Sequence, residues 1–251
     1  MGWDRLASPA ERWWTQPEVS ELFPRVTPQS ISRYHAFMKF LIASFLLTAV
    51  IARGAEPVSS IMGADETQID PKKVEDFIAW VEPSIREYPP RFKDDDEEQS
   101  LQYCALLVMG EIKKLDPKTI KDAAVLTNLA HILSMGNNLD FPTGAQAKTF
   151  FEHALSLDPN SKRANYLFGM FLIATDKFHL ESLPYLQKAF SLGEKDAQYS
   201  VGLLFCEMGN KTQGLQDLEA YSKANPENEK AKQVIQSIKD GTLTFEHING
   251  G

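Results

Sequence analysis

The segment ANYLFG, residues 164–169, returns 33 positions later as AQYSVG, residues 197–202. Alanine stands first, tyrosine third and glycine sixth in both copies. Self-similarity at a fixed period of roughly 20–50 residues is typical of chains that stack one supersecondary unit on the next. Small residues let the two helices of a hairpin approach closely, and large residues fill the space between hairpins. The recurrence therefore predicts stacked helical hairpins.

A second pattern marks the helices that follow these segments. One set of residues has offsets of 0, 4, 7 and 12, and ends in a proline that stops the helix before the next hairpin begins. The sets that share these offsets are Ala147, Phe151, Ala154 and Pro159; Gly214, Leu218, Tyr221 and Pro226; Ser182, Leu186 and Ala189, with Glu194 in place of proline; and, more weakly, Ala105, Met109, Ile112 and Pro117.

These patterns resemble the tetratricopeptide repeat, with a period of about 34 residues, and the related Sel-like repeats. The resemblance covers residues 120–226 in three repeats, the first of which has a long turn at 136–144. It implies an all-α fold, an α-solenoid of antiparallel helical hairpins. Residues 228–240 look like the polar capping helix that the end of a solenoid requires.

Helical periodicity begins at Pro71, with Asp70 as the expected cap, and Pro83 and Pro89-Pro90 bend or end that helix. Short breaks rich in Gly, Asn, Asp and Pro separate the later helices. The expected ranges are 96–115, 120–135, 144–157, 161–175, 179–191, 195–208, 211–224 and 228–240. Residues 71–117 form an irregular N-terminal helical hairpin in this interpretation, 118–240 the repeats and capping helix, and 241–251 a flexible tail.

The region before Pro71 indicates export. Residues 40–52 (FLIASFLLTAVIA) carry no charge and follow Lys39, which suits the apolar core of a secretory signal, at about 7–15 residues, better than a bilayer span of about 20. We therefore expect a signal peptide or signal anchor at 38–54 that starts at Met38, and a linker at 55–70. Residues 1–37 are then an upstream extension or a short cytoplasmic tail.

Two locations follow from this interpretation. Cleavage would leave the mature chain periplasmic or secreted. Without cleavage, the chain would be membrane-anchored through 38–54, with residues 53–251 outside the cytoplasm. A buried core helix is the remaining alternative for the apolar run.

The resemblance also implies a binding site. In tetratricopeptide proteins the first helix of each hairpin lines a concave groove that holds a partner protein or peptide. By position, the groove residues here are Thr127 and His131; Arg163, Tyr166, Met170 and Ile173; and Asp196, Tyr199, Leu203 and Cys206. For Tyr166 and Tyr199 the alternative is packing between repeats with the hydroxyl reaching water. Exposed aromatic side chains are the usual anchors of protein interfaces.

Other classes of function find little support. A net charge of −8 disfavours nucleic-acid binding, which needs a clustered positive surface. The five histidines are scattered without acids or thiolates at ligand spacing, so we expect no metal, no cofactor and no enzyme. Cys104 and Cys206 fall in distant hairpins, so no disulfide is expected. A protein-binding scaffold is the favoured function. The alternatives are a structural assembly component that docks through its convex face or residues 71–117, and an enzyme with an unrecognised site.

Overall fold

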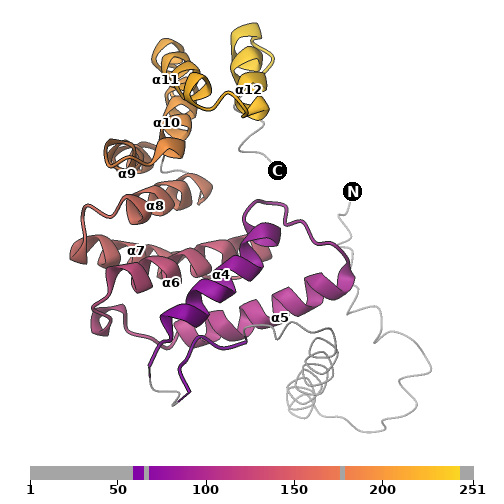
Figure 1. Ribbon diagram of the computed structural model, residues 1–251, viewed down its shortest axis with the longest axis vertical. Helices are drawn as coiled ribbons and strands as arrows, with labels where there is room; N and C mark the ends of the chain where they lie inside the picture. Colours follow the sequence, from indigo (N-terminus) through magenta and orange to yellow (C-terminus); the bar gives the residue numbers. More distant parts are fainter. Residues whose placement is uncertain (1–58, 65–67, 176–178, 244–251) are drawn as a thin grey trace, which may run out of the picture. The chain divides into compact units, whose positions relative to one another are not determined.

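The computed structural model describes residues 59–64, 68–175 and 179–243, and the side chains of His179 and Leu180 are not included. The signal segment, the residues before it and the tail from 244 lie outside the described residues. Regular structure in the described part is helical (Figure 1). The helices are α4 (Pro71–Ile85), α5 (Asp95–Ile112), α6 (Ala123–Gly136), α7 (Gly144–Leu157), α8 (Lys162–Ala174), α9 (His179–Ser191), α10 (Lys195–Glu207), α11 (Lys211–Ala224) and α12 (Glu229–Asp240), with short 3-10 turns η1 (Pro117–Thr119) and η2 (Asn137–Leu139).

Local side chains set where many of these helices begin. Polar N-cap side chains accept hydrogen bonds from the first-turn amides, which have no partner within the helix. Residues in this role are Asp70, Asp94, Asp122, Ser161, Asn210 and Asn228. Two glycines with positive φ, Gly193 and Gly209, follow the ends of α9 and α10. Glycine adopts this left-handed conformation without a steric penalty, so it ends helices sharply.

Consecutive helices pair as hairpins: α6 with α7, α8 with α9, and α10 with α11. Small residues permit the close approach. A Cβ atom at Gly169 would lie 2.6 Å from Cγ of Leu186, and one at Gly202 would lie 2.8 Å from Cγ of Leu218. The same glycine–leucine contact thus recurs in two successive hairpins. The predicted all-α solenoid of antiparallel helical hairpins is confirmed.

Aromatic rings join the first hairpin to the second. Phe151 of α7 stacks on Phe168 of α8, with ring centroids 5.3 Å apart, and lies 5.8 Å from Phe171. Tyr185 of α9 meets Phe168 edge-on at 4.7 Å. These side chains belong to the largest core cluster, which continues through α6 and α5 to α4.

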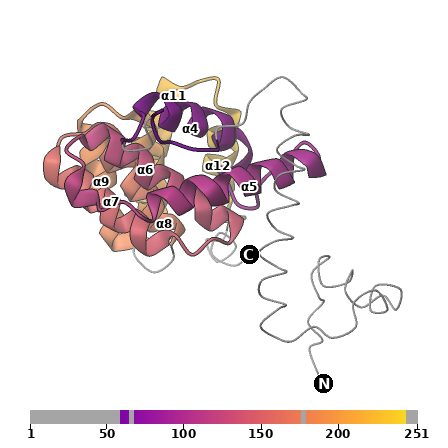
Figure 2. The ribbon, with the colours of Figure 1, turned by 90° about the horizontal axis from the view of Figure 1, so that it is seen from below.

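The N-terminal helices differ from the other hairpins. Both α4 and α5 pack against α6, and α4 does so more extensively. On α4 the stripe Val74, Phe77, Ile78, Val81 and Ile85 is buried. The first turns of α5 extend past the neighbouring helices (Figure 2).

A predicted linker turns out to be partly packed. Met62 and Ile69 form an antiparallel bridge, and Ile61 is fully buried. The carboxylate of Glu111 on α5 accepts hydrogen bonds from the Ser60 hydroxyl at 2.7 Å and the Ile61 amide at 2.9 Å. The described parts of 55–70 therefore form part of the fold, through a contact to a residue 50 positions away.

At the other end, α12 presents Ala231, Ile235 and Ile238 to the core, and its remaining residues are polar or more exposed. It packs on α11, as expected of the predicted capping helix. Gly241, with a φ of 70°, ends it.

Candidate partner-binding groove

The first helices of the three hairpins are α6, α8 and α10, and we call the surface they share the inner face. Of the residues that sequence reasoning assigned to it, Thr127 and His131 lie on α6 and are only 2% and 7% exposed. The reason is that α4 lies across α6 and covers them. These two side chains therefore present almost no surface to a partner while α4 is in place.

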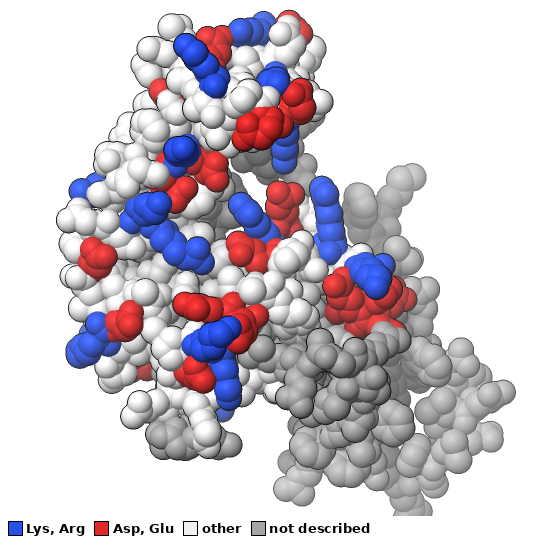
Figure 3. All heavy atoms as spheres, in the orientation of Figure 1, with Lys and Arg blue, Asp and Glu red and all other residues white. Residues whose placement is uncertain are grey.

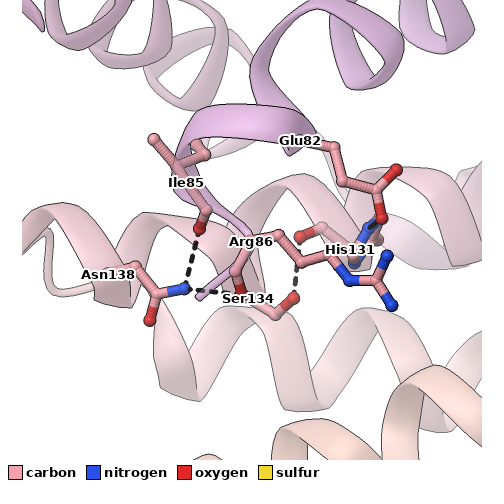
Figure 4. Close-up of polar contacts among 6 residues, drawn as sticks. All are labelled: Glu82, Ile85, Arg86, His131, Ser134 and Asn138. Carbon is pink, nitrogen blue, oxygen red and sulfur yellow. Dashed lines mark hydrogen bonds and ion pairs between the residues drawn. The ribbon is translucent and has the colours of Figure 1, made fainter. Parts of the chain in front are cut away.

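Polar contacts at its C-terminal end fix α4 to α6 and to the η2 turn that follows α6 (Figure 4). His131 Nε2 lies 3.4 Å from Glu82 Oε1. The Asn138 amide nitrogen donates to the carbonyl oxygens of Ile85 at 2.8 Å and Arg86 at 3.2 Å, which the end of a helix leaves without intrahelical partners. Sequence reasoning missed this role of α4, although its apolar stripe was visible.

The His131 side chain beside Glu82 holds the pKa of that carboxyl below its ordinary value of 4.5, and the nearby Arg86 and Arg163 act in the same direction. A carboxyl whose pKa is lowered by folding stabilises the fold most above its ordinary pKa. That contribution is lost as the pH falls through the lowered pKa.

We therefore expect Glu82→Gln to lower the free energy of unfolding by up to about 1 kcal/mol at pH 6, and by clearly less at pH 3, because protonation removes the same charge from the unsubstituted chain. Urea titrations at the two pH values measure this. Glu87→Gln, at an exposed position just beyond α4, is the control and should show no such change. A Glu82→Gln effect that grows on acidification would refute the assignment.

A cleft of about 510 Å³ opens where α4, α6 and the start of α8 meet. Thr127 and Arg163 of the predicted groove line it together with Glu75, Ile78 and Glu82 of α4. The carboxylate of Glu82 on α4 and the guanidinium group of Arg163 on α8 are close enough to interact electrostatically there. Over the face shown in Figure 3, basic and acidic side chains are likewise interspersed.

The α8 part of the inner face remains open. Met170 is 36% exposed and Arg163 is exposed, whereas Tyr166 and Ile173 are partly buried against the second core cluster. Burial raises the pKa of the Tyr166 hydroxyl, and the nearby carboxylate of Asp196 adds to this effect. Side chains of α8 and α10 therefore lie next to each other here.

The α10 part is partly engaged in packing. Tyr199 and Leu203 are half-buried against the third core cluster, and the ring of Tyr199 lies 5.3 Å from that of Tyr221. The Tyr221 hydroxyl donates a 2.9 Å hydrogen bond to Asp196, which is otherwise exposed. The Ser200 hydroxyl lies 3.3 Å from the sulfur of Met170. Tyr166 and Tyr199 therefore combine packing between repeats with a partly exposed surface.

Comparisons with known proteins give fold-level likenesses only. No family model matches the chain, and no curated protein matches it in sequence. Among solved structures, a crystal structure of MamA is 20% identical over 60% of this chain and 86% of its own, with a TM-score of 0.48. A second MamA structure covers 57% of this chain and 73% of its own, at 20% identity and a TM-score of 0.42. TTC0263, a thermophilic TPR protein in Thermus thermophilus, is 12% identical over 78% of this chain and 98% of its own, with a TM-score of 0.44.

Residues 59–64, 68–175 and 179–243 contain no group of three or more His, Cys, Asp or Glu side chains placed to hold a metal ion. No helix in these ranges is long and apolar enough to cross a bilayer. Cys104 and Cys206 are free and buried in separate core clusters, and burial raises the pKa of the Cys104 thiol to about 11.

Proposed function

We propose that this chain is a protein-binding scaffold that holds a segment of another protein across the inner face of α8 and α10. The supporting observation is a pair of side-chain rows on consecutive first helices. Tyr166, Met170 and Ile173 follow one another at helical spacing on α8, and Tyr199 and Leu203 do so on α10. All five are at least partly exposed. Apolar and aromatic side chains presented in this way suit an amphipathic helix or an extended peptide.

Charges at one end of these rows favour one direction for the bound segment. Arg163 and Asp196 occupy equivalent places near the starts of α8 and α10, and both are exposed. A partner with an acidic group near Arg163 and a basic group near Asp196 would be bound in one orientation. Because α4 covers the corresponding part of α6, the proposed binding surface is confined to the second and third hairpins.

Replacement of Met170 by glutamate tests the proposal. A charge at the centre of the apolar row should weaken partner binding at least about tenfold, which corresponds to about 1.4 kcal/mol. Met208→Glu is the matched control, since Met208 is 45% exposed but lies at the turn after α10. Each variant is used as bait in a pull-down. The dissociation constants of the two variants for the recovered protein are then compared by titration. Equal partner binding by the two variants would exclude the side-chain row of α8 as the binding surface.

The alternative of an assembly component that docks through residues 71–117 also has an observation in its favour. Leu106 and Leu107 are exposed and lie on α5, which is not one of the helices of the inner face. A partner lost with Leu106→Glu but retained with Met170→Glu would favour this alternative.

We further propose that the chain is exported, on the basis of the uncharged run 40–52 directly after Met38-Lys39. N-terminal sequencing of the form found outside the cytoplasm tests this. A terminus at Arg53 or Ala55 would support export with cleavage. A chain that keeps Met1 or Gly2 in the membrane would contradict cleavage and favour the signal anchor, and a chain found only in the cytoplasm would contradict export.

A further inference from the structure

Helix α5 is apolar on two opposite sides. One side carries buried core residues, namely Leu101, Cys104, Ala105, Val108, Met109 and Ile112. The other side carries Tyr103, Leu106, Leu107 and Gly110, at the i, i+3, i+4 and i+7 spacing of one helical face. Tyr103 is half-buried, because part of its side chain packs against the core cluster. Leu106 is 57% exposed and Leu107 is 37% exposed. We call these four residues the α5 stripe. A helix that is apolar on both sides is typical of one covered on both sides.

The α5 stripe is complementary to itself. An antiparallel pairing of two α5 helices about a two-fold axis between residues 106 and 107 brings Leu106 next to Leu107 of the second copy. It also brings the ring of Tyr103 opposite Gly110 of that copy. A Cβ atom at Gly110 would meet no atom within 4 Å, so there is open space for the ring. An isologous interface of this kind needs each large group to meet a matching space on an identical surface.

Charge at the two ends of α5 favours the same arrangement. Its first turn carries Asp95, Asp96, Glu97 and Glu98, while Lys113 and Lys114 are exposed directly after its last turn. An antiparallel pair places the acidic end of each helix beside the basic end of the other, whereas a parallel pair places like charges together. Red atoms gather at the start of α5 in Figure 3, and Figure 2 shows this end extending beyond the other helices.

We propose that two copies of this chain associate through antiparallel α5 helices, with the α5 stripes in contact. A contact limited to one helix from each copy is small beside the roughly 1,200–2,000 Å² of a standard stable interface, so we expect weak association that depends on concentration. The stripe does not include the inner face of α8 and α10, and a dimer formed in this way carries two separate copies of the proposed partner site. The proposed association through α5 therefore does not rest on the proposed function.

Sedimentation of the full chain over a range of concentrations tests the association. The expected result is a mass that rises from 28.2 kDa towards twice that value. Gly110→Gln should raise the dissociation constant at least tenfold, because its side chain fills the space for the Tyr103 ring. The variant folds normally and its melting temperature stays the same or rises, since that side chain meets no neighbour within the chain and glutamine favours helix.

Phe190→Gln is the control, because Phe190 is 43% exposed on α9, outside the α5 stripe, and should leave the association unchanged. A chain that stays monomeric at every concentration would overturn the proposal. The α5 stripe would then be covered by the chain's own preceding residues or by another protein. Association of the Gly110→Gln variant as strong as that of the unsubstituted chain would also overturn it.

Cross-linking tests the antiparallel register. Residue 99 lies next to residue 114 of the second copy in this pairing, and both Gln99 and Lys114 are exposed. A mixture of Gln99→Cys chains and Lys114→Cys chains should form a disulfide-linked dimer under mild oxidation, and neither variant alone should do so. The native cysteines are buried and do not compete. Equal cross-linking by each variant alone would exclude the antiparallel arrangement.

Discussion

Replacing Phe151 by alanine is expected to lower the free energy of unfolding by about 3–5 kcal/mol. The side chain is fully buried, and its ring contacts Phe168 and Phe171 across the junction of the first two hairpins. Its removal leaves a cavity that rigid helices on both sides cannot close. Because α7 and α8 meet mainly through such side chains, the loss should also uncouple the first hairpin from the second.

Urea unfolding followed by far-UV circular dichroism measures this effect. Phe190→Ala is the matched control, since Phe190 on α9 is 43% exposed, and it should change stability far less than Phe151→Ala does. Similar losses for the two variants would mean that the aromatic cluster does not hold the hairpins together.

Gly214→Ala is expected to destabilise the third hairpin by about 1–3 kcal/mol, although alanine favours helix over glycine by about 1 kcal/mol. A Cβ atom at Gly214 would lie 2.5 Å from the carbonyl oxygen of Gly202 and 2.8 Å from the amide nitrogen of Cys206. Both are backbone atoms of α10, so the methyl group fits only if α10 and α11 move apart.

Gly110→Ala is a control for which we expect the opposite change in stability. Gly110 lies within α5, and an added Cβ there meets nothing within 4 Å. Gly110→Ala should therefore raise stability by up to about 1 kcal/mol. Melting temperatures of the two variants give the comparison, and a stabilising effect of Gly214→Ala would contradict the close approach of the two helices.

The sequence alone was sufficient to predict the helices of the repeats, and there is a physical reason for this. Hairpins of this kind are held by local contacts that recur with the period, so Gly169 and Gly202 could be recognised as close-approach positions from their spacing alone. The expected bounds of α7, α9 and α11 coincide with those observed, and the others differ by a few residues at the ends, where caps and fraying decide.

The sequence was not sufficient for contacts between distant segments. The repeat register places Thr127 and His131 at groove positions. The register holds no information on α4, which precedes the repeats at Pro71–Ile85 and covers these two residues. The sequence around residues 60 and 61 has no periodic pattern of apolar residues. The position of these two residues depends on their hydrogen bonds to Glu111. In both cases long-range packing, which has no sequence period, decides which surface is open.

The central proposal is that a partner protein contacts the inner face of α8 and α10. A photo-reactive benzoylphenylalanine at position 166 tests this most directly, because it keeps the aromatic ring that Tyr166 places on the partly exposed inner face. The same group at position 190 on α9 is the control for the opposite helix of the hairpin. We predict that irradiation cross-links a partner protein to position 166 and not to position 190. Cross-linking at position 190 without cross-linking at position 166 would contradict the proposed groove.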